Sequence, residues 1–134
     1  MQREIKFRVW DIKGKKLYYP DLIAISRIGA VRIGIDVNFL PGDSVVQQFT
    51  GLKDKSGKDI YEGDIVKFTT NNTDNLSMES VGQIYFDEYR VMIKDIRYKW
   101  PNPPADDFDW LRFYRKWDKE VIGNIFENPE LLNN

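Results

Sequence analysis

The stretch TGLKDKSGKDIYEGDIV, residues 50–66, holds the densest turn chemistry in this chain of 134 residues. It combines glycines, which permit a positive φ, with aspartates, whose carboxylates accept hydrogen bonds from nearby backbone N–H groups. The glycines are Gly51, Gly57 and Gly63, and the aspartates are Asp54, Asp59 and Asp64. Ser56-Gly57 predicts a charged hairpin tip between Leu52 and Ile60, and Gly63-Asp64 predicts the turn that opens the next strand. We therefore expect this stretch to fix how two strands meet.

Strand patterns precede this stretch. Residues 5–10 alternate apolar and polar side chains with the period of a half-buried strand. Gly14 supplies a turn into a second strand at residues 16–19, which predicts a hairpin with a basic tip. Residues 45–49 form a further strand candidate.

A second hairpin is predicted about Gly29, from residues 22–28 and residues 30–35. The side chains available to a core from this hairpin are Ile23, Ile25, Val31, Ile33 and Ile35. Residues 36–43 contain a proline and a glycine, and we expect them to form a loop.

The second half of the chain resembles small SH3-like barrels in its pattern. Residues 81–86 and 89–96 predict a hairpin, and residues 121–126 predict a last strand that closes a partly open barrel. Residues 71–79 are polar and rich in turn formers, so we expect a mobile loop there.

One helix is expected over residues 106–117, because aromatic side chains recur there at i, i+3, i+4 and i+7. These side chains are Trp110, Phe113, Tyr114 and Trp117. Asn128 followed by Pro129 predicts an N-cap and the first residue of a short closing turn.

Together these patterns predict a mostly β protein with minor α content. Its N-terminal β-hairpins precede a C-terminal SH3-like, partly open barrel with one short helix. Residues 1–134 form one protein, with an N-terminal hairpin lobe at residues 1–63 and an SH3-like lobe at residues 64–134.

Composition excludes several classes of chemistry. The chain has no Cys and no His, which removes disulfides, cysteine nucleophiles, Ser-His catalysis and imidazole or thiolate metal sites. Lys plus Arg number 20 and Asp plus Glu number 21, so there is no basic excess for binding nucleic acid. No apolar run spans a membrane and no signal peptide is evident, so we expect a cytoplasmic protein without a membrane partner.

Three segments carry a family resemblance: FRVWDIKGKKLYY at residues 7–19, QFTGLKDKSGKDIYEGDIVKF at residues 48–68, and EVIGNIFENPELL at residues 120–132. Together they resemble the YopX-like family of phage and prophage proteins. The resemblance implies a small protein encoded in phage or prophage regions of bacteria, mainly Gram-positive hosts, with no established biochemical activity. It supplies no catalytic residues, and residues 110–117 depart from the family pattern.

The quoted turn stretch has two interpretations. In the structural one, Gly51, Gly57, Gly63 and Asp64 form a turn motif that fixes strand geometry. In the functional one, carboxylates of the stretch bind a hard cation such as Mg²⁺ or Ca²⁺. The carboxylates are Asp54, Asp59, Glu62 and Asp64. The spacing matches no EF-hand loop and interleaved lysines oppose a cation, so we favour the structural interpretation and expect no metal and no cofactor.

A basic and aromatic segment is the best binding candidate. Aromatic side chains that stack on bases, beside cations that neutralise phosphate, are typical of surfaces for single-stranded nucleic acid. The candidate residues are Tyr98, Trp100, Arg112, Arg115 and Trp117. Nearby aspartates would repel phosphate, and the same aromatic residues fit the core face of the expected helix, so nucleic acid is not favoured.

Four Trp residues are more than one small core easily hides, and strand edges in a β-rich chain can pair between subunits. We therefore expect a homo-oligomer, with a phage or host protein as a further partner. No nucleophile elbow or phosphate-binding loop is present, so no catalytic residue is predicted. The predicted function is a non-enzymatic accessory or interaction protein that self-associates; the alternative is a nucleic-acid-associated phage protein.

Overall fold

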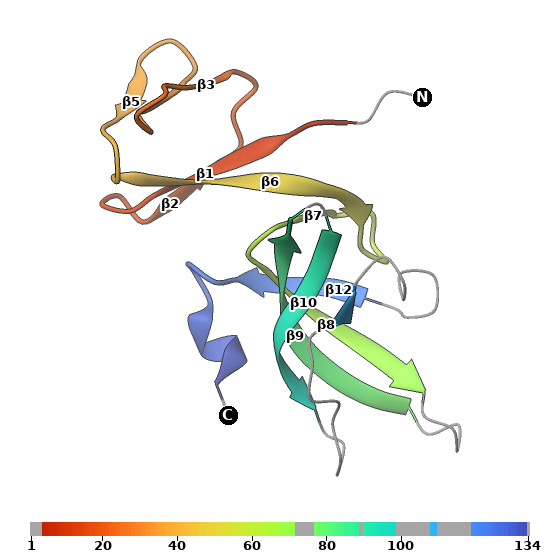
Figure 1. The fold of residues 1–134 in the computed structure, drawn as a ribbon. Coiled ribbons are helices and arrows are strands. Elements are labelled where there is room, and N and C mark those ends of the chain that lie inside the picture. Colours follow the sequence, from red (N-terminus) through yellow and green to blue (C-terminus); the bar gives the residue numbers. More distant parts are fainter. Residues whose placement is uncertain (1–3, 72–76, 89, 99–107, 110–118, 134) are drawn as a thin grey trace. The chain divides into compact units, whose positions relative to one another are not determined.

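The computed structural model describes residues 4–71, 77–88, 90–98, 108–109 and 119–133. The chain divides into two compact units, Met1–Phe49 and Thr50–Asn134, and Figure 1 labels most of their strands. The division falls within one strand, earlier in the chain than the predicted division after residue 63.

The first unit contains two small antiparallel sheets. Its strands are β1 (Phe7–Asp11), β2 (Lys16–Tyr18), β3 (Ile23–Ile25), β4 (Val31–Ile33), β5 (Val37–Phe39) and the first part of β6 (Ser44–Lys53). In one sheet β1 lies between β2 and β6, and the other has the order β3-β4-β5. The predicted hairpins at residues 5–19 and 22–35 are therefore present.

The core of the first unit is built from side chains of both sheets. Val9 of β1 is fully buried and contacts a cluster that includes Val31 and Ile33 of β4 and Phe39 of β5. Alternation along each short strand directs one set of side chains inward, which explains why apolar residues two apart share this core. Four buried side chains make up this cluster, so the core is small.

The predicted turn between β1 and β2 is present, and its glycine is needed for space rather than for a positive φ. Lys15, not Gly14, adopts the positive φ, at 53°. Gly14 instead donates its N–H to a carboxylate oxygen of Asp11 at 2.9 Å. A Cβ at Gly14 would lie 2.4 Å from the other carboxylate oxygen, so the glycine is needed for this close approach.

The second unit is a curled half-barrel. Its strands are the end of β6, then β7 (Asp59–Tyr61), β8 (Asp64–Asn71), β9 (Ser77–Asp87), β10 (Arg90–Tyr98), β11 (Phe108–Asp109) and β12 (Lys119–Asn124), followed by the 3₁₀ turn η1 (Pro129–Leu132). The curled sheet has the order β11-β10-β9-β8-β12, all antiparallel. The mostly β prediction, with a partly open barrel in the second half, is confirmed.

The core of the second unit is larger and tighter. Its fully or nearly fully buried side chains are Ile60, Val66, Phe68, Ile84, Val91 and Ile93. They come from the strands β7 to β10, and half-buried Leu52, Phe86 and Val121 pack against them. This unit therefore has a continuous apolar core of its own.

Two predicted elements were wrong in part. Residues 36–43 were expected to be a loop, but Val37–Phe39 forms β5 because it pairs with β4. Residues 106–117 were expected to be a helix, but Phe108–Asp109 pairs with Met92 and Ile93 of β10. Tertiary pairing outweighs local pattern in both segments. Residues 110–118 lie outside the described residues, as do residues 72–76 of the predicted loop.

The closing turn is a 3₁₀ helix with proline in its first turn, but Asn128 makes no side-chain cap hydrogen bond. Its side-chain oxygen instead accepts a hydrogen bond from the N–H of Asn124 at 3.3 Å. Asn124 in turn accepts hydrogen bonds from the N–H groups of Phe126 and Glu127. The two asparagine side chains therefore bind backbone N–H groups between residues 124 and 127 and fold the chain end back.

Candidate interaction surface

The three-stranded sheet of the first unit presents one apolar row to the core and one mixed row to solvent. The inner rows are Ile23–Ile33–Val37 and Ile25–Val31–Phe39, and the outer row between them is Ala24–Arg32–Asn38. The inner side chains of β4 are 5% exposed, whereas the residues of the outer row are all exposed. This alternation is that of a sheet covered on one face only.

Short turns hold the three strands in register. Gly29 has a φ of 91° and donates its N–H to the carbonyl of Ser26 at 3.0 Å. The N–H of Ala30 donates to the Ser26 hydroxyl oxygen at 2.9 Å. At the other end, Gly34 has a φ of 62° and donates its N–H to the carbonyl of Leu22. These bonds hold two isoleucines, Ile28 and Ile35, at the turn tips.

Exposed large apolar side chains concentrate in this unit. Among the described residues they are Ile5, Ile12, Tyr19, Leu22, Ile25, Ile28, Ile35 and Leu40, and all of them precede Phe49. Five belong to the segment that builds the three-stranded sheet: Leu22, Ile25, Ile28, Ile35 and Leu40, which we call the hairpin surface. Ile35 is 90% exposed, the largest value among them. Clustered exposed apolar residues are typical of protein–protein contact sites.

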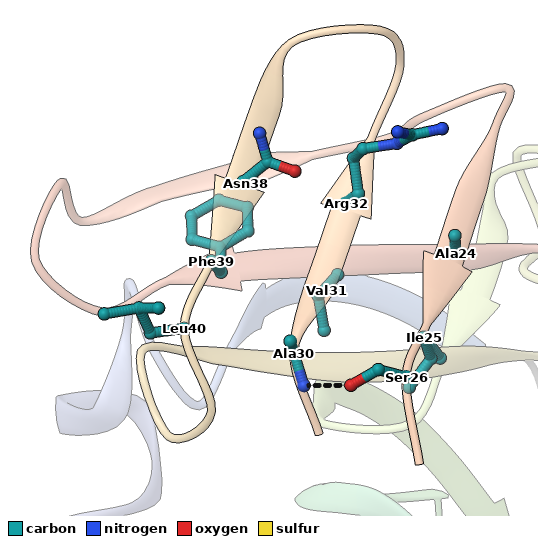
Figure 2. Close-up of a pocket in the computed structure, with 9 residues that line it drawn as sticks. All are labelled: Ala24, Ile25, Ser26, Ala30, Val31, Arg32, Asn38, Phe39 and Leu40. Atoms are coloured by element: carbon teal, nitrogen blue, oxygen red, sulfur yellow. Dashed lines mark hydrogen bonds between the residues drawn. The ribbon is translucent and has the colours of Figure 1, made fainter. Parts of the chain in front are cut away.

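A pocket of about 450 Å³ lies on the same sheet (Figure 2). Its lining includes the outer row Ala24, Arg32 and Asn38, together with Ile25 and Leu40 of the hairpin surface. Figure 2 shows the Arg32 side chain extending away from Leu40. The pocket therefore combines apolar walls with one cation and one amide, a mixture suited to contact with another protein.

The hairpin surface was not predicted from the sequence. Ile25 and Ile35 were expected in the core, but Ile25 is 54% exposed and Ile35 is 90% exposed. The available signal was the placement of Ile28 and Ile35 next to glycines at turn positions, where polar residues are usual.

The turn stretch at residues 50–66 has a structural role in the second unit. Gly51, Gly57 and Gly63 have φ of 86°, 84° and 84°. Gly63 donates its N–H to the Ile84 carbonyl at 2.7 Å and accepts a hydrogen bond from the N–H of Ile125 at 2.9 Å. This glycine therefore ties β9 to the segment after β12.

The aspartates of this stretch accept hydrogen bonds from the backbone. One Asp54 carboxylate oxygen accepts the N–H groups of Ser56 and Lys58, and the other accepts the N–H of Val121 at 3.1 Å. Burial alone would raise the pKa of Asp54, but these three N–H groups and the Lys58 charge lower it below its usual range. Buried Asp64 accepts the N–H of Tyr61 at 2.8 Å.

These contacts favour the structural interpretation over a cation site. Asp59 pairs with the Lys53 ammonium at 2.7 Å, and Asp54 and Asp64 face backbone donors. Within the described part of the chain, no group of three or more Asp or Glu side chains could hold a metal ion.

Of the five residues of the basic and aromatic candidate site, the structure describes only Tyr98. Tyr98 ends β10, where its backbone pairs with Ser80 of β9. Trp100, Arg112, Arg115 and Trp117 lie outside the described residues. The nucleic-acid surface therefore stays a prediction. None of the described segments forms a helix long and apolar enough to cross a membrane.

Comparison with known families supports the resemblance noted in the sequence. Residues 6–133 match the family described as YopX protein, nearly the whole chain. The chain belongs to the YopX family. This is not a family of known enzymes.

A solved structure is similar to this YopX family protein over its full length. It is the crystal structure of protein EF1440 from Enterococcus faecalis, with 27% sequence identity and a TM-score of 0.57. The similarity covers 98% of this chain and 100% of that chain. Among curated proteins, no match was found.

Proposed function

We propose that this YopX family protein is a non-enzymatic accessory protein, encoded by a phage or prophage, that assembles with copies of itself in the bacterial cytoplasm. The observation that carries the proposal is the hairpin surface, where exposed Leu and Ile side chains gather on one three-stranded sheet. Burying such side chains against a second copy stabilises an assembly by about 25 cal/mol per Å² of apolar area.

The size of the first unit supports the same conclusion. It spans residues 1–49, and its buried cluster consists of Val9, Val31, Ile33 and Phe39. Cores of this size supply only a few kcal/mol, and small domains without disulfides or metals usually gain stability by association. The chain has no Cys, so it cannot form disulfides, and without Cys or His it lacks the thiolate and imidazole ligands of most structural metal sites.

Light scattering on a sizing column tests the proposal. We expect a defined oligomer at tens of micromolar whose mass is unchanged by a mixed single-stranded oligonucleotide, at low and at moderate salt. Replacing the turn-tip residues, Ile28→Ser with Ile35→Ser, should weaken the oligomer. Ile12→Ser is the matched control, because Ile12 is 44% exposed but lies on the β1–β2 turn.

Two outcomes would contradict the proposal. A monomeric mass at tens of micromolar removes self-association. A monomer that shifts only with oligonucleotide at low salt favours the alternative, a nucleic-acid-associated protein. In that case Arg112→Ala with Arg115→Ala should reduce the salt dependence of binding.

A further inference from the structure

Strand β3 is one of the two edges of the three-stranded sheet, the other being β5, and no other described strand pairs with the outer side of β3. The residue pairs on either side of β3 show which of its backbone groups form hydrogen bonds with β4. Gly34 donates to the carbonyl of Leu22, and Ser26 donates to the carbonyl of Ala30. Because hydrogen-bonded and non-hydrogen-bonded pairs alternate in an antiparallel ladder, Ala24 is also directed toward β4. The N–H and C=O groups of Ile23 and Ile25 therefore point outward.

The sequence around β3 is complementary to itself when read in the opposite direction. Residues 21–27 read DLIAISR, with a carboxylate at one end, a guanidinium at the other and Ala24 at the centre. In an antiparallel pair of two copies centred on Ala24, Asp21, in the bend before β3, faces Arg27, in the turn that follows β3 of the other copy. Ile23 likewise lies opposite Ile25, so apolar side chains meet apolar side chains.

The residues that this pairing needs are accessible. Asp21 and Arg27 are exposed, and neither forms an ion pair within the described residues. Ala24 is exposed on the outer row and its small side chain permits close approach of a second strand. Ile25, whose row faces the core, is 54% exposed.

We infer that β3 pairs antiparallel with β3 of a second copy across a twofold axis at Ala24, joining two three-stranded sheets into one sheet of six strands. The inference rests on the proposed self-association and names the contact that produces it. Outward groups of Ile23 in each copy exchange hydrogen bonds with those of Ile25 in the other. At each end of the contact, Asp21 of one copy then forms an ion pair with Arg27 of the other.

The charges select this register. Shifting the pair by two residues moves Asp21 opposite Ile25 in one direction, and moves Arg27 opposite Ile23 in the other. Either shift loses both ion pairs and leaves a charge opposite an apolar side chain. A contact across a twofold axis uses the same surface of both copies, and twofold symmetry is the commonest in oligomers of identical chains.

Charge reversal tests the contact. Asp21→Arg and Arg27→Asp should each raise the dissociation constant about tenfold or more, since both ends of the contact then carry like charges. A one-to-one mixture of the two variants should recover association, because each mixed pair restores both ion pairs. The double variant should recover it too. Lys13→Asp, at the β1–β2 turn, is the matched control and should leave association unchanged.

A cysteine on the axis tests the register. Ala24→Cys places two thiols on a non-hydrogen-bonded pair, with Cα atoms about 4.5 Å apart, within reach of a disulfide. The chain has no other Cys, so oxidised glutathione should convert this variant to a covalent dimer. Arg32→Cys, on β4 in the same outer row, is the control and should stay uncrosslinked.

The outcomes separate this contact from self-association in general. A monomeric wild type overturns both. An oligomeric wild type whose mass is indifferent to both single charge reversals, or whose Ala24→Cys variant does not crosslink, overturns the β3 contact alone. In that second case the Ile28→Ser and Ile35→Ser variant shows whether the hairpin surface still mediates association.

Discussion

The two compact units bury their apolar side chains to different extents. In the second unit, six side chains that span β7 to β10 are 0% to 3% exposed and form one cluster. In the first unit the comparable cluster has four members, while Leu and Ile residues at its turns and edge are 54% to 90% exposed. The second unit therefore completes its own core, and the first leaves apolar surface for a partner.

Polar groups show the same contrast. The second unit uses Asp54, Asp64 and Gly63 to tie turns to strands through short backbone hydrogen bonds. The first unit presents Asp21 and Arg27 at the surface beside an unpaired strand edge. Asp54 and Asp64 thus stabilise the fold of the second unit, whereas Asp21 and Arg27 of the first unit are available for association.

The largest expected effect is on the core of the second unit. Phe68→Ala removes a side chain that is 0% exposed, and we expect it to lower the free energy of unfolding by about 3–5 kcal/mol. Denaturant unfolding measures this. Leu40→Ala is the control, because Leu40 is 71% exposed and should change stability by about 0.5 kcal/mol or less. Equal losses for the two variants would contradict the contrast between the units.

Gly63→Val tests the turn that joins β9 to the end of the chain. A β-branched residue is strained at a φ of 84°, and two backbone hydrogen bonds depend on this position. We expect a loss of about 3 kcal/mol, from strain of about 1–3 kcal/mol and weakened hydrogen bonds. A thermal melt measures it, and an unchanged melting temperature would remove this role for Gly63.

Asp54→Asn tests the carboxylate that joins the residue 54–58 turn to β12. The amide can still accept the Ser56 and Lys58 donors, but its NH₂ group opposes the Val121 N–H. We expect a loss of about 1.5–3 kcal/mol at neutral pH, the usual contribution of a hydrogen bond to a charged group.

The loss should depend on pH. Because the pKa of Asp54 is lower in the folded protein than its value of about 3.9 in an unfolded chain, its stabilisation is complete at higher pH. It declines as the pH falls below about 3.9, through the folded pKa. The difference between the variant and the wild type should therefore narrow in acid. A constant difference from pH 7 to pH 3 would contradict this linkage.

The smallest expected effect on folding is at the turn tip of the first unit. Ile35 is 90% exposed, so Ile35→Ser should change the stability of the monomer by about 0.5 kcal/mol or less. The wild type should melt at a higher temperature as its concentration rises, since association stabilises the folded state. The melting temperature of Ile35→Ser should rise less with protein concentration than that of the wild type. A strong loss of stability in the variant at low concentration would contradict the exposed position of Ile35.

Much of the fold was predictable because local chemistry decides it. The glycines and aspartates of residues 50–66 predicted the β6–β7 and β7–β8 turns, and alternation predicted β1, β4 and most of β9 and β10. The short strands β5 and β11 were missed, because each is defined by pairing with a neighbour rather than by its own residues.

The sequence by itself determined the mostly β fold, the turn positions and the family, since these follow from residue type and spacing within short segments. Only the tertiary structure decided which apolar rows are covered. Period-two alternation shows which side chains share a face, but Ile25, Val31 and Phe39 share a row and are 54%, 5% and 9% exposed, a difference that only the fold shows. Likewise, the sequence shows the charges of Asp21 and Arg27 at the two ends of DLIAISR. Only the hydrogen bonds to β4 show that the N–H and C=O groups of Ile23 and Ile25 point away from β4.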